Sequence, residues 1–290
     1  MIAFVRGDRP SLTAAIVSFF RGIASLDPRG PCCDPMAIDL LPPALAALLR
    51  GLERSGRARP VMERALRAGG LVSHLELRTA LVDEAVREAV AEGCRQLVLL
   101  GAGLDSRAWR MPELDDVSVF EVDHPATQAW KRERVDGRAP LARSLEFVPM
   151  DFETTALADA LAATKHDDSV PTVWVWEGVT PYLEPIAVEE IIADIEARSG
   201  PESRLVLTYL TPEVLVAGPF RRLADSALRS MGEPLRSTFD PAQIAAKLEE
   251  AGFRVLSDEL PADAGRRHGR TSRPGWISPA ERVLRAEKFT

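Results

Sequence analysis

The sequence predicts an α/β protein with a doubly wound, mostly parallel sheet that follows an N-terminal helical region. Three observations support this fold class. Residues 1 to about 92 show helical patterns broken by Pro- and Gly-rich turns, and no strand candidate. From residue 95 onward, short apolar runs alternate with helical stretches, and the first run leads into a glycine-spaced loop. Strands that alternate with helices typically pair in parallel, with helices on both faces of the sheet.

Seven apolar runs are the strand candidates, and the last of them lies at the C-terminus. They read QLVLL (96–100), VSVFEV (117–122), SLEFVP (144–149), TVWVW (172–176), SRLVLTYL (203–210), FRVLSDEL (253–260) and ERVLRAEKF (281–289). The stretch 185–200 between two of them predicts a helix that ends at a C-capping Gly200. We expect a helical cap over 1–92 and a core over 93–290 with a substrate lid around 211–239, integrated as one domain.

Composition excludes some classes of function. The 290 residues are 46% hydrophobic, enough for a large core, and the net charge of -7 argues against a nucleic-acid-binding surface. Three cysteines predict a reducing compartment without a disulfide framework. The four histidines are scattered and no metal-ligand spacing occurs, so no metal site is predicted.

The apolar stretch 12–20 resembles the centre of a signal peptide, but its periodicity favours a helix of the mature protein. The apolar residues that share one helical face are Leu12, Ile16, Phe19, Phe20 and Ile23. No small-residue cleavage site follows, and the stretch is too short to span a membrane. We therefore expect a cytoplasmic protein without a membrane partner; the sequence predicts no oligomeric state.

The loop after the first strand candidate reads Gly101-Ala102-Gly103. Two glycines allow a ligand to approach the backbone closely, although a tight turn alone would also explain them. The dinucleotide fingerprint needs a third glycine where this chain has Ser106. Asp105 is expected to cap the helix that begins near Ser106.

Carboxylates follow the next three strand candidates. Asp123 lies 20 residues after Gly103, the spacing at which a carboxylate binds both ribose hydroxyls in enzymes that use NAD or S-adenosylmethionine. Asp151 could accept a hydrogen bond from the adenine amino group and Phe152 could flank the ring, unless Asp151 caps a helix. Glu177 follows a strand with two tryptophans, where an unpaired carboxylate would cost several kcal/mol. An amino group or a sulfonium would be a suitable partner for it.

Arg78 is a candidate by helical geometry. The apolar stripe of helix 74–93 comprises Leu81, Val82, Ala85, Val86, Ala89 and Val90. At about 100° per residue Arg78 lies about 60° from Leu81, inside this stripe. A guanidinium on a buried face needs an anion, and a carboxylate fits its fork. The alternatives are an internal carboxylate such as Asp83, or a snorkelling side chain.

S-adenosylmethionine is a ligand that would satisfy all these residues. Arg78 would bind its carboxylate, the loop of Gly101 and Gly103 its methionine portion, and Asp123 its ribose. Asp151 would bind its adenine and Glu177 would lie near its ammonium group. Because this cofactor has no phosphate, the third glycine is not required.

The chain resembles a known family at these positions. The segments QLVLLGAGLDSRAWRMP, FEVDHPATQAWK and WEGVTPYLEP are similar to the leucine carboxyl methyltransferase family, in particular its bacterial branch that includes polyketide O-methyltransferases. The likeness is clear over about 74–210. It implies a class I methyltransferase (Rossmann-like) sheet of seven strands with a helical N-terminal cap, and the segment RTALVDEAV resembles the one that carries the family's cofactor-binding arginine. Asp151-Phe152 departs from the family's usual Asp-Leu.

The predicted function is therefore S-adenosylmethionine-dependent O-methylation of a carboxylate, or a hydroxyl, of a small molecule. The acceptor oxygen would displace the methyl group in line, and positioning would supply most of the catalysis. A carboxylate needs no general base, and Tyr182 could orient the acceptor or be a core or lid residue. A nicotinamide-dependent oxidoreductase, which would need the third glycine and a Tyr-Lys pair, and a non-catalytic nucleoside-binding module are the alternatives.

Overall fold

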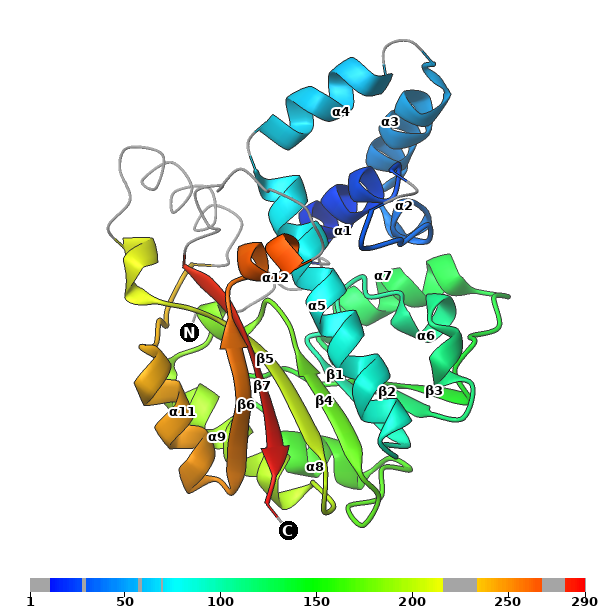
Figure 1. Cartoon of the computed structure of the whole chain (residues 1–290). Helices are drawn as coiled ribbons and strands as arrows, with labels where there is room; N and C mark the ends of the chain where they lie inside the picture. Colours follow the sequence, from blue (N-terminus) through cyan, green and yellow to red (C-terminus); the bar gives the residue numbers. More distant parts are fainter. Residues whose placement is uncertain are drawn as a thin grey trace.

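The computed structural model describes residues 11–27, 30–56, 59–68, 70–215, 234–267 and 280–289. Its centre is a seven-stranded sheet with the order β3-β2-β1-β4-β5-β7-β6 (Figure 1). The first five strands pair in parallel, whereas β7 is antiparallel to both β5 and β6. The predicted fold class and all seven predicted strands are confirmed.

The strands begin and end close to the predicted positions. They are β1 Gln96–Leu100, β2 Ser118–Asp123, β3 Ser144–Pro149, β4 Thr172–Trp176, β5 Arg204–Leu210, β6 Phe253–Glu259 and β7 Glu281–Lys288. Every residue of β1 and of β4 is buried, as in strands covered on both faces. Alternate residues of each strand therefore belong to two different cores.

The helices form a layer on each face of the sheet (Figure 1). One core lies between the sheet and α5 Leu71–Ala91, α6 Arg107–Arg110 and α7 Pro125–Val135. The other core lies between the sheet and α8 Leu157–Ala162, α9 Pro185–Ala197 and α11 Pro241–Glu250. The carboxyl ends of the five parallel strands meet at the edge of the sheet that faces the N-terminal helices.

In the described part of the chain before α5, four helices lie at the top of Figure 1: α1 Leu12–Ala24, α2 Ala37–Leu40, α3 Pro43–Arg54 and α4 Arg59–Ala68. The predicted helix is confirmed as α1, and Phe19, Phe20 and Ile23 of its apolar face belong to the core of the N-terminal helices, whereas Leu12 is exposed and Ile16 is half-buried. Ser18 and Arg21 are also buried, since they bind polar groups of neighbouring segments. The proposed cap boundary at residue 92 falls at the end of α5, whose residues also pack on the sheet.

The structure differs from the prediction at the end of α9. Helix α9 ends at Ala197 with Arg198 as its C-cap, so the prediction of a C-capping Gly200 is wrong. Gly200 instead packs against the backbone of Ser169 and Val170, where a Cβ would lie 2.9 Å from the nearest atom. Among the described residues, no helix is long and apolar enough to cross a membrane.

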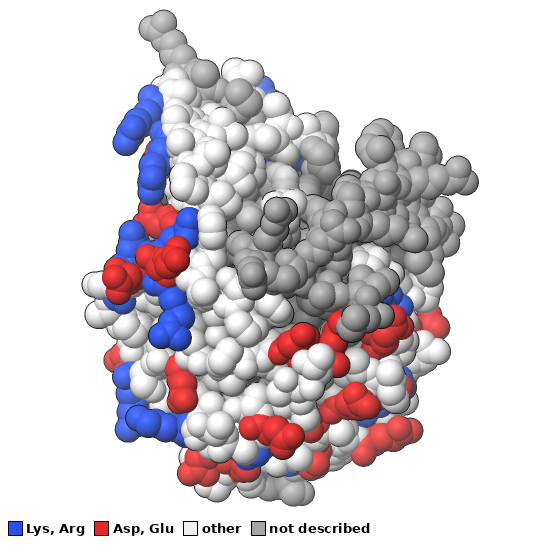
Figure 2. Space-filling model, turned by 180° about the vertical axis from the view of Figure 1, so that it is seen from behind, with Lys and Arg blue, Asp and Glu red and all other residues white. Residues whose placement is uncertain are grey.

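Figure 2 shows the charged side chains on the face opposite to that of Figure 1. Acidic side chains are spread over its lower half, where α8, α9 and α11 lie. Lys and Arg side chains gather along one edge, next to acidic ones. This face therefore carries charges of both signs, with acidic groups prominent below.

Candidate active site

The glycine loop after β1 has a backbone that suits glycine. Gly101 and Gly103 have φ angles of 65° and 49°, in the left-handed region. A Cβ at Gly101 would overlap Val179, and one at Gly103 would lie 3.1 Å from the Cβ of Ala14 in α1. Val179, which follows β4, and Ala14, in the N-terminal helices, therefore lie directly against the predicted loop.

Asp123, the last residue of β2, lies directly against this loop. Its Oδ2 accepts a hydrogen bond from the backbone N–H of Gly103, and its Oδ1 accepts one from the N–H of His124 at 2.6 Å. His124 itself is the N-cap of α7. Burial raises the pKa of Asp123 to about 6, although the two N–H groups favour its ionised form. Each oxygen keeps a lone pair for a further donor.

Asp151 lies beside Asp123 at the neighbouring strand end. The N–H of Met150 donates to the carbonyl oxygen of Asp123 at 2.9 Å. The Oδ1 of Asp151 accepts from the N–H of Glu153 at 2.9 Å and so stabilises a turn. Helix α8 begins later, with Ala156 as its N-cap, so the alternative that Asp151 caps a helix is wrong. Phe152 is half-buried against the core that includes α8 and α9.

Arg78 of α5 is buried, as the helical geometry predicted, and directly binds Glu177. Its Nε donates to Glu177 Oε1 at 2.9 Å, and its Nη1 donates to Glu281 Oε1 at 2.8 Å. Arg78 therefore does pair with internal carboxylates, as one alternative expected, but Asp83 is not among them, because Asp83 binds Arg107 and Arg110. Arg78 and Glu177 were predicted separately, and the structure brings them into contact.

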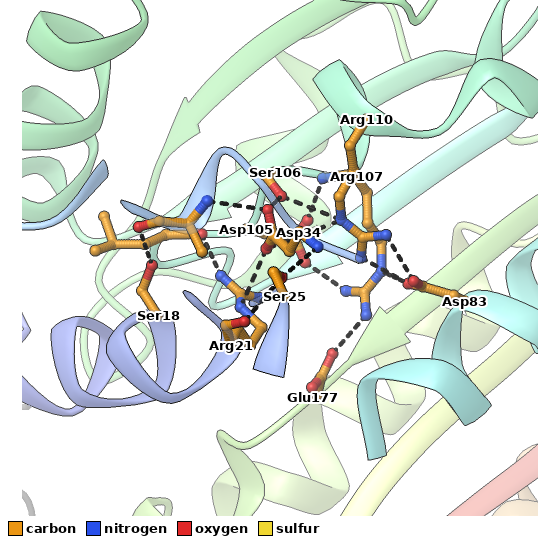
Figure 3. Close-up of polar contacts among 12 residues, drawn as sticks. Ser18, Arg21, Ser25, Asp34, Asp83, Asp105, Ser106, Arg107, Arg110 and Glu177 are labelled. Carbon is orange, nitrogen blue, oxygen red and sulfur yellow. Dashed lines mark hydrogen bonds and ion pairs between the residues drawn. The ribbon is translucent and has the colours of Figure 1, made fainter. Parts of the chain in front are cut away.

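Arg107, at the start of α6, is the main residue of the site that the sequence analysis missed (Figure 3). Its fully buried guanidinium binds Asp83 at 2.7 Å, Glu177 Oε2 at 2.8 Å, and Asp105. Asp105 also accepts from the N–H of Arg107, while Ser106 is the N-cap of α6. The carboxylates raise the pKa of Arg107 against the effect of burial. Arg107 thus joins α5, the β1–α6 loop and the end of β4.

The same loop is bound to the N-terminal helices through Asp34 (Figure 3). Ser106 Oγ donates to Asp34 Oδ1 at 2.6 Å, and Arg21 Nε lies 3.3 Å from Asp34 Oδ2. Arg21 also donates to the carbonyl oxygen of Leu104. Arg110 completes the group with two hydrogen bonds to Asp83, at 2.6 and 2.8 Å. A buried polar network therefore connects the cap to the predicted cofactor loop.

Tyr182 lies in the short 3₁₀-helix Thr180–Tyr182, five residues after Glu177, and is half-buried. The chain leads back to this helix at residues 236 and 237: the N–H of Arg236 donates to the Pro181 carbonyl at 2.7 Å, and Ser237 Oγ to the Thr180 carbonyl at 2.8 Å.

Residues 216–233 of the predicted lid lie outside the described residues. In the described part of the chain, no cluster of His, Cys, Asp or Glu is placed to hold a metal.

The sheet has the strand order of a class I methyltransferase, and comparison with known proteins identifies the family. The sequence model of the leucine carboxyl methyltransferase family matches residues 14–196. A relative from Streptomyces coelicolor is 35% identical, with 71% of this chain and 69% of the relative covered. One from Mycolicibacterium smegmatis is 34% identical, with coverage of 76% and 73%. A third relative, from Streptomyces avermitilis, is 42% identical over 46% of this chain and 47% of its own length.

Solved structures show the same fold at low sequence identity. A DUF574 family protein of Streptomyces avermitilis has a TM-score of 0.64 and 17% identity, with 96% of this chain and 98% of that chain covered. A protein of Thermobifida fusca assigned to the methyltransferases has a TM-score of 0.59 and 17% identity, with coverage of 98% and 97%.

The chain belongs to the leucine carboxyl methyltransferase family. The three relatives are assigned as S-adenosyl-L-methionine-dependent methyltransferases. The predictions of family, enzyme class and cofactor are thereby confirmed, and the nicotinamide-dependent alternative is not supported.

Proposed function

We propose that the chain transfers the methyl group of S-adenosylmethionine to a carboxylate oxygen of a small molecule. When bound, the cofactor supplies a methyl group on a positively charged sulfur. Asp123 would accept the ribose hydroxyls, because each of its oxygens has a lone pair left beside its N–H bond. Asp151 would accept from the adenine amino group at the neighbouring strand end.

Arg78 and Glu177 would bind the amino acid portion of the cofactor. The two hydrogen bonds of Arg78 use only two of the five guanidinium N–H groups, and Nη2 makes none of the bonds found within the described residues. Nη2 lies 3.5 Å from the position that a Cβ of Gly178 would take. Gly178, with φ 71°, places no Cβ against this edge. Two donors on a buried edge suit a carboxylate, and Glu177 beside them suits an ammonium.

The state of Glu177 carries the preference for a carboxylate acceptor. Burial opposes its charge, but Arg107 and Arg78 outweigh burial and keep the pKa of Glu177 below its ordinary value. A carboxylate stabilised by two arginines is a poor general base. A hydroxyl acceptor would need a base to take its proton, whereas an acceptor carboxylate is already ionised. Tyr182 would then orient the acceptor without accepting a proton.

Methyl transfer to matched acceptor pairs tests the proposal. Each pair shares one scaffold that bears either a carboxylate or a hydroxyl, and mass spectrometry distinguishes ester from ether products. We expect esters, with kcat/KM nearly constant from pH 7 to 9. We also expect Tyr182→Phe to lower kcat/KM about tenfold, in the range of a single oriented hydrogen bond. Tyr209→Phe is the control, since that hydroxyl binds Asp258 at 2.7 Å.

Two results would contradict the proposal. One is ether formation alone, with a rate that rises with pH. The other is methylation of nitrogen acceptors in preference to both members of each pair.

A further inference from the structure

Glu281 reaches the predicted cofactor residues from a part of the chain that the family match does not include. The match ends at residue 196, and Glu281 is the first residue of β7. Its Oε1 accepts from Arg78 Nη1 at 2.8 Å, across 203 positions of sequence. Its Oε2 pairs with Nε2 of His74, which lies one helical turn before Arg78 on α5. The side chains of this triad, His74, Arg78 and Glu281, are all buried.

The register of the sheet fixes the place of Glu281. It pairs with Leu210 of β5 in the antiparallel ladder, and the N–H of Thr211 donates to the Ala280 carbonyl at 2.7 Å. Arg78 and His74 keep the pKa of Glu281 low, at about 2, although burial raises it. The carboxylate is therefore ionised at neutral pH and rigidly held.

The two carboxylates that bind Arg78 hold different nitrogens of its guanidinium. Glu177 binds Nε and Glu281 binds Nη1, so the plane of the group is fixed, and its Nη1 and Nη2 lie 3.6 and 3.5 Å from the position that a Cβ of Gly178 would take. With Glu177 as its only partner, the guanidinium could turn to form the favoured two-bond pair with that carboxylate. The donors would then be directed away from the position proposed for the ligand.

We propose that Glu281, supported by His74, is a positioning residue that holds Arg78 in the orientation that binds the cofactor carboxylate. The inference rests on the proposed role of Arg78. Glu281 acts through Arg78 and does not itself touch the cofactor. Its loss therefore affects only ligands that carry the amino acid carboxylate.

Calorimetry with two ligands tests this role. S-adenosylhomocysteine carries the carboxylate, whereas 5′-methylthioadenosine lacks the whole amino acid portion. We expect Glu281→Ala to weaken S-adenosylhomocysteine at least tenfold and 5′-methylthioadenosine less than twofold. Glu281→Gln keeps an acceptor oxygen for Nη1, so its loss should be intermediate, about threefold to fivefold. The matched control is Glu287→Ala in the same strand, whose carboxylate binds Arg204 and Arg254 and which should leave both affinities unchanged.

Parallel titration of Arg78→Lys separates this inference from the proposed function. If Arg78→Lys weakens both ligands equally, the proposed role of Arg78 is wrong, and the role of Glu281 with it. If Arg78→Lys is selective but Glu281→Ala is not, only the inference is wrong. If Glu281→Ala does not fold, Glu281→Gln decides. Unchanged binding of S-adenosylhomocysteine by that variant means that the Glu281 carboxylate does not position Arg78, and tighter binding means that it competes with the ligand.

Discussion

Replacing Arg107 with methionine should lower the free energy of unfolding by about 3–5 kcal/mol, because it removes the shared partner of three carboxylates. Asp83 would keep Arg110, and Glu177 would keep Arg78, but Asp105 would lose the one cation that hydrogen-bonds to it within the described residues. Methionine fills most of the volume of the arginine side chain, so the fall in the free energy of unfolding reflects lost ion pairs more than lost packing. The cost approaches the total stability of many domains.

Urea unfolding at pH 7 and pH 3 measures this effect. In the wild type the pKa values of Asp105 and Glu177 are lowered, so their contribution to stability is present above the ordinary carboxyl range and is lost as the pH falls. The variant lacks most of that contribution, so the difference between the two proteins should shrink at pH 3, below the ordinary pKa values of Asp and Glu. Arg87→Met, which breaks the exposed pair with Glu113, should cost less than about 1 kcal/mol. Equal costs for the two variants would show that Arg107 is not the centre of the network.

Asp123→Ala should weaken cofactor binding by about 2–4 kcal/mol, roughly 30-fold to 1,000-fold, without unfolding the chain. The reason is the loss of an acceptor for two ribose hydroxyls. The control compares 5′-methylthioadenosine with its 2′,3′-dideoxy analogue. Because the analogue lacks the ribose hydroxyls, Asp123→Ala should hardly change the affinity for it. Unchanged affinity together with a large fall in melting temperature would make Asp123 structural.

Asp123 should also make cofactor binding depend on pH. Burial raises the pKa of Asp123 to about 6 in the free protein, and the ribose hydroxyls would favour the ionised form. Affinity should therefore fall roughly tenfold from pH 8 to pH 5, and the fall should disappear in Asp123→Ala. The effect of pH on the free energy of unfolding has opposite signs for Asp123 and Glu177. The raised pKa of Asp123 contributes to stability below the ordinary pKa of Asp, and this contribution is lost as the pH rises through about 6.

Local patterns were sufficient to predict the sheet and to bring most of the candidate site residues to one edge of it. Apolar runs bounded by turn residues predicted each strand, and the carboxyl ends of parallel strands necessarily meet at one edge. The 3.6-residue period placed Arg78 on a buried face. These inferences need only short segments, because each depends on local geometry or on a general property of parallel sheets.

The buried ion pairs could not be predicted in this way, because their partners are far apart in the sequence. Arg107 and Asp83 are 24 positions apart, and Arg78 and Glu281 are 203 apart. An isolated Arg at a helix start or Glu at a strand start ordinarily faces solvent. The predicted buried face of α5 was also too narrow. The helix lies between the N-terminal helices and the sheet, so it buries Asp83 and His74 as well.

The most direct test of the account is the coupling between Arg78 and the cofactor carboxylate. Calorimetry would compare wild type and Arg78→Lys, each with S-adenosylhomocysteine and with 5′-methylthioadenosine, and Arg204→Lys as the control at a peripheral pair with Glu92. Lysine keeps the charge but loses the planar fork, so we expect the first ligand to weaken about 30-fold and the second less than twofold. That result gives a coupling energy of about 2 kcal/mol. A coupling energy near zero, with both ligands weakened alike, would contradict the proposed cofactor site.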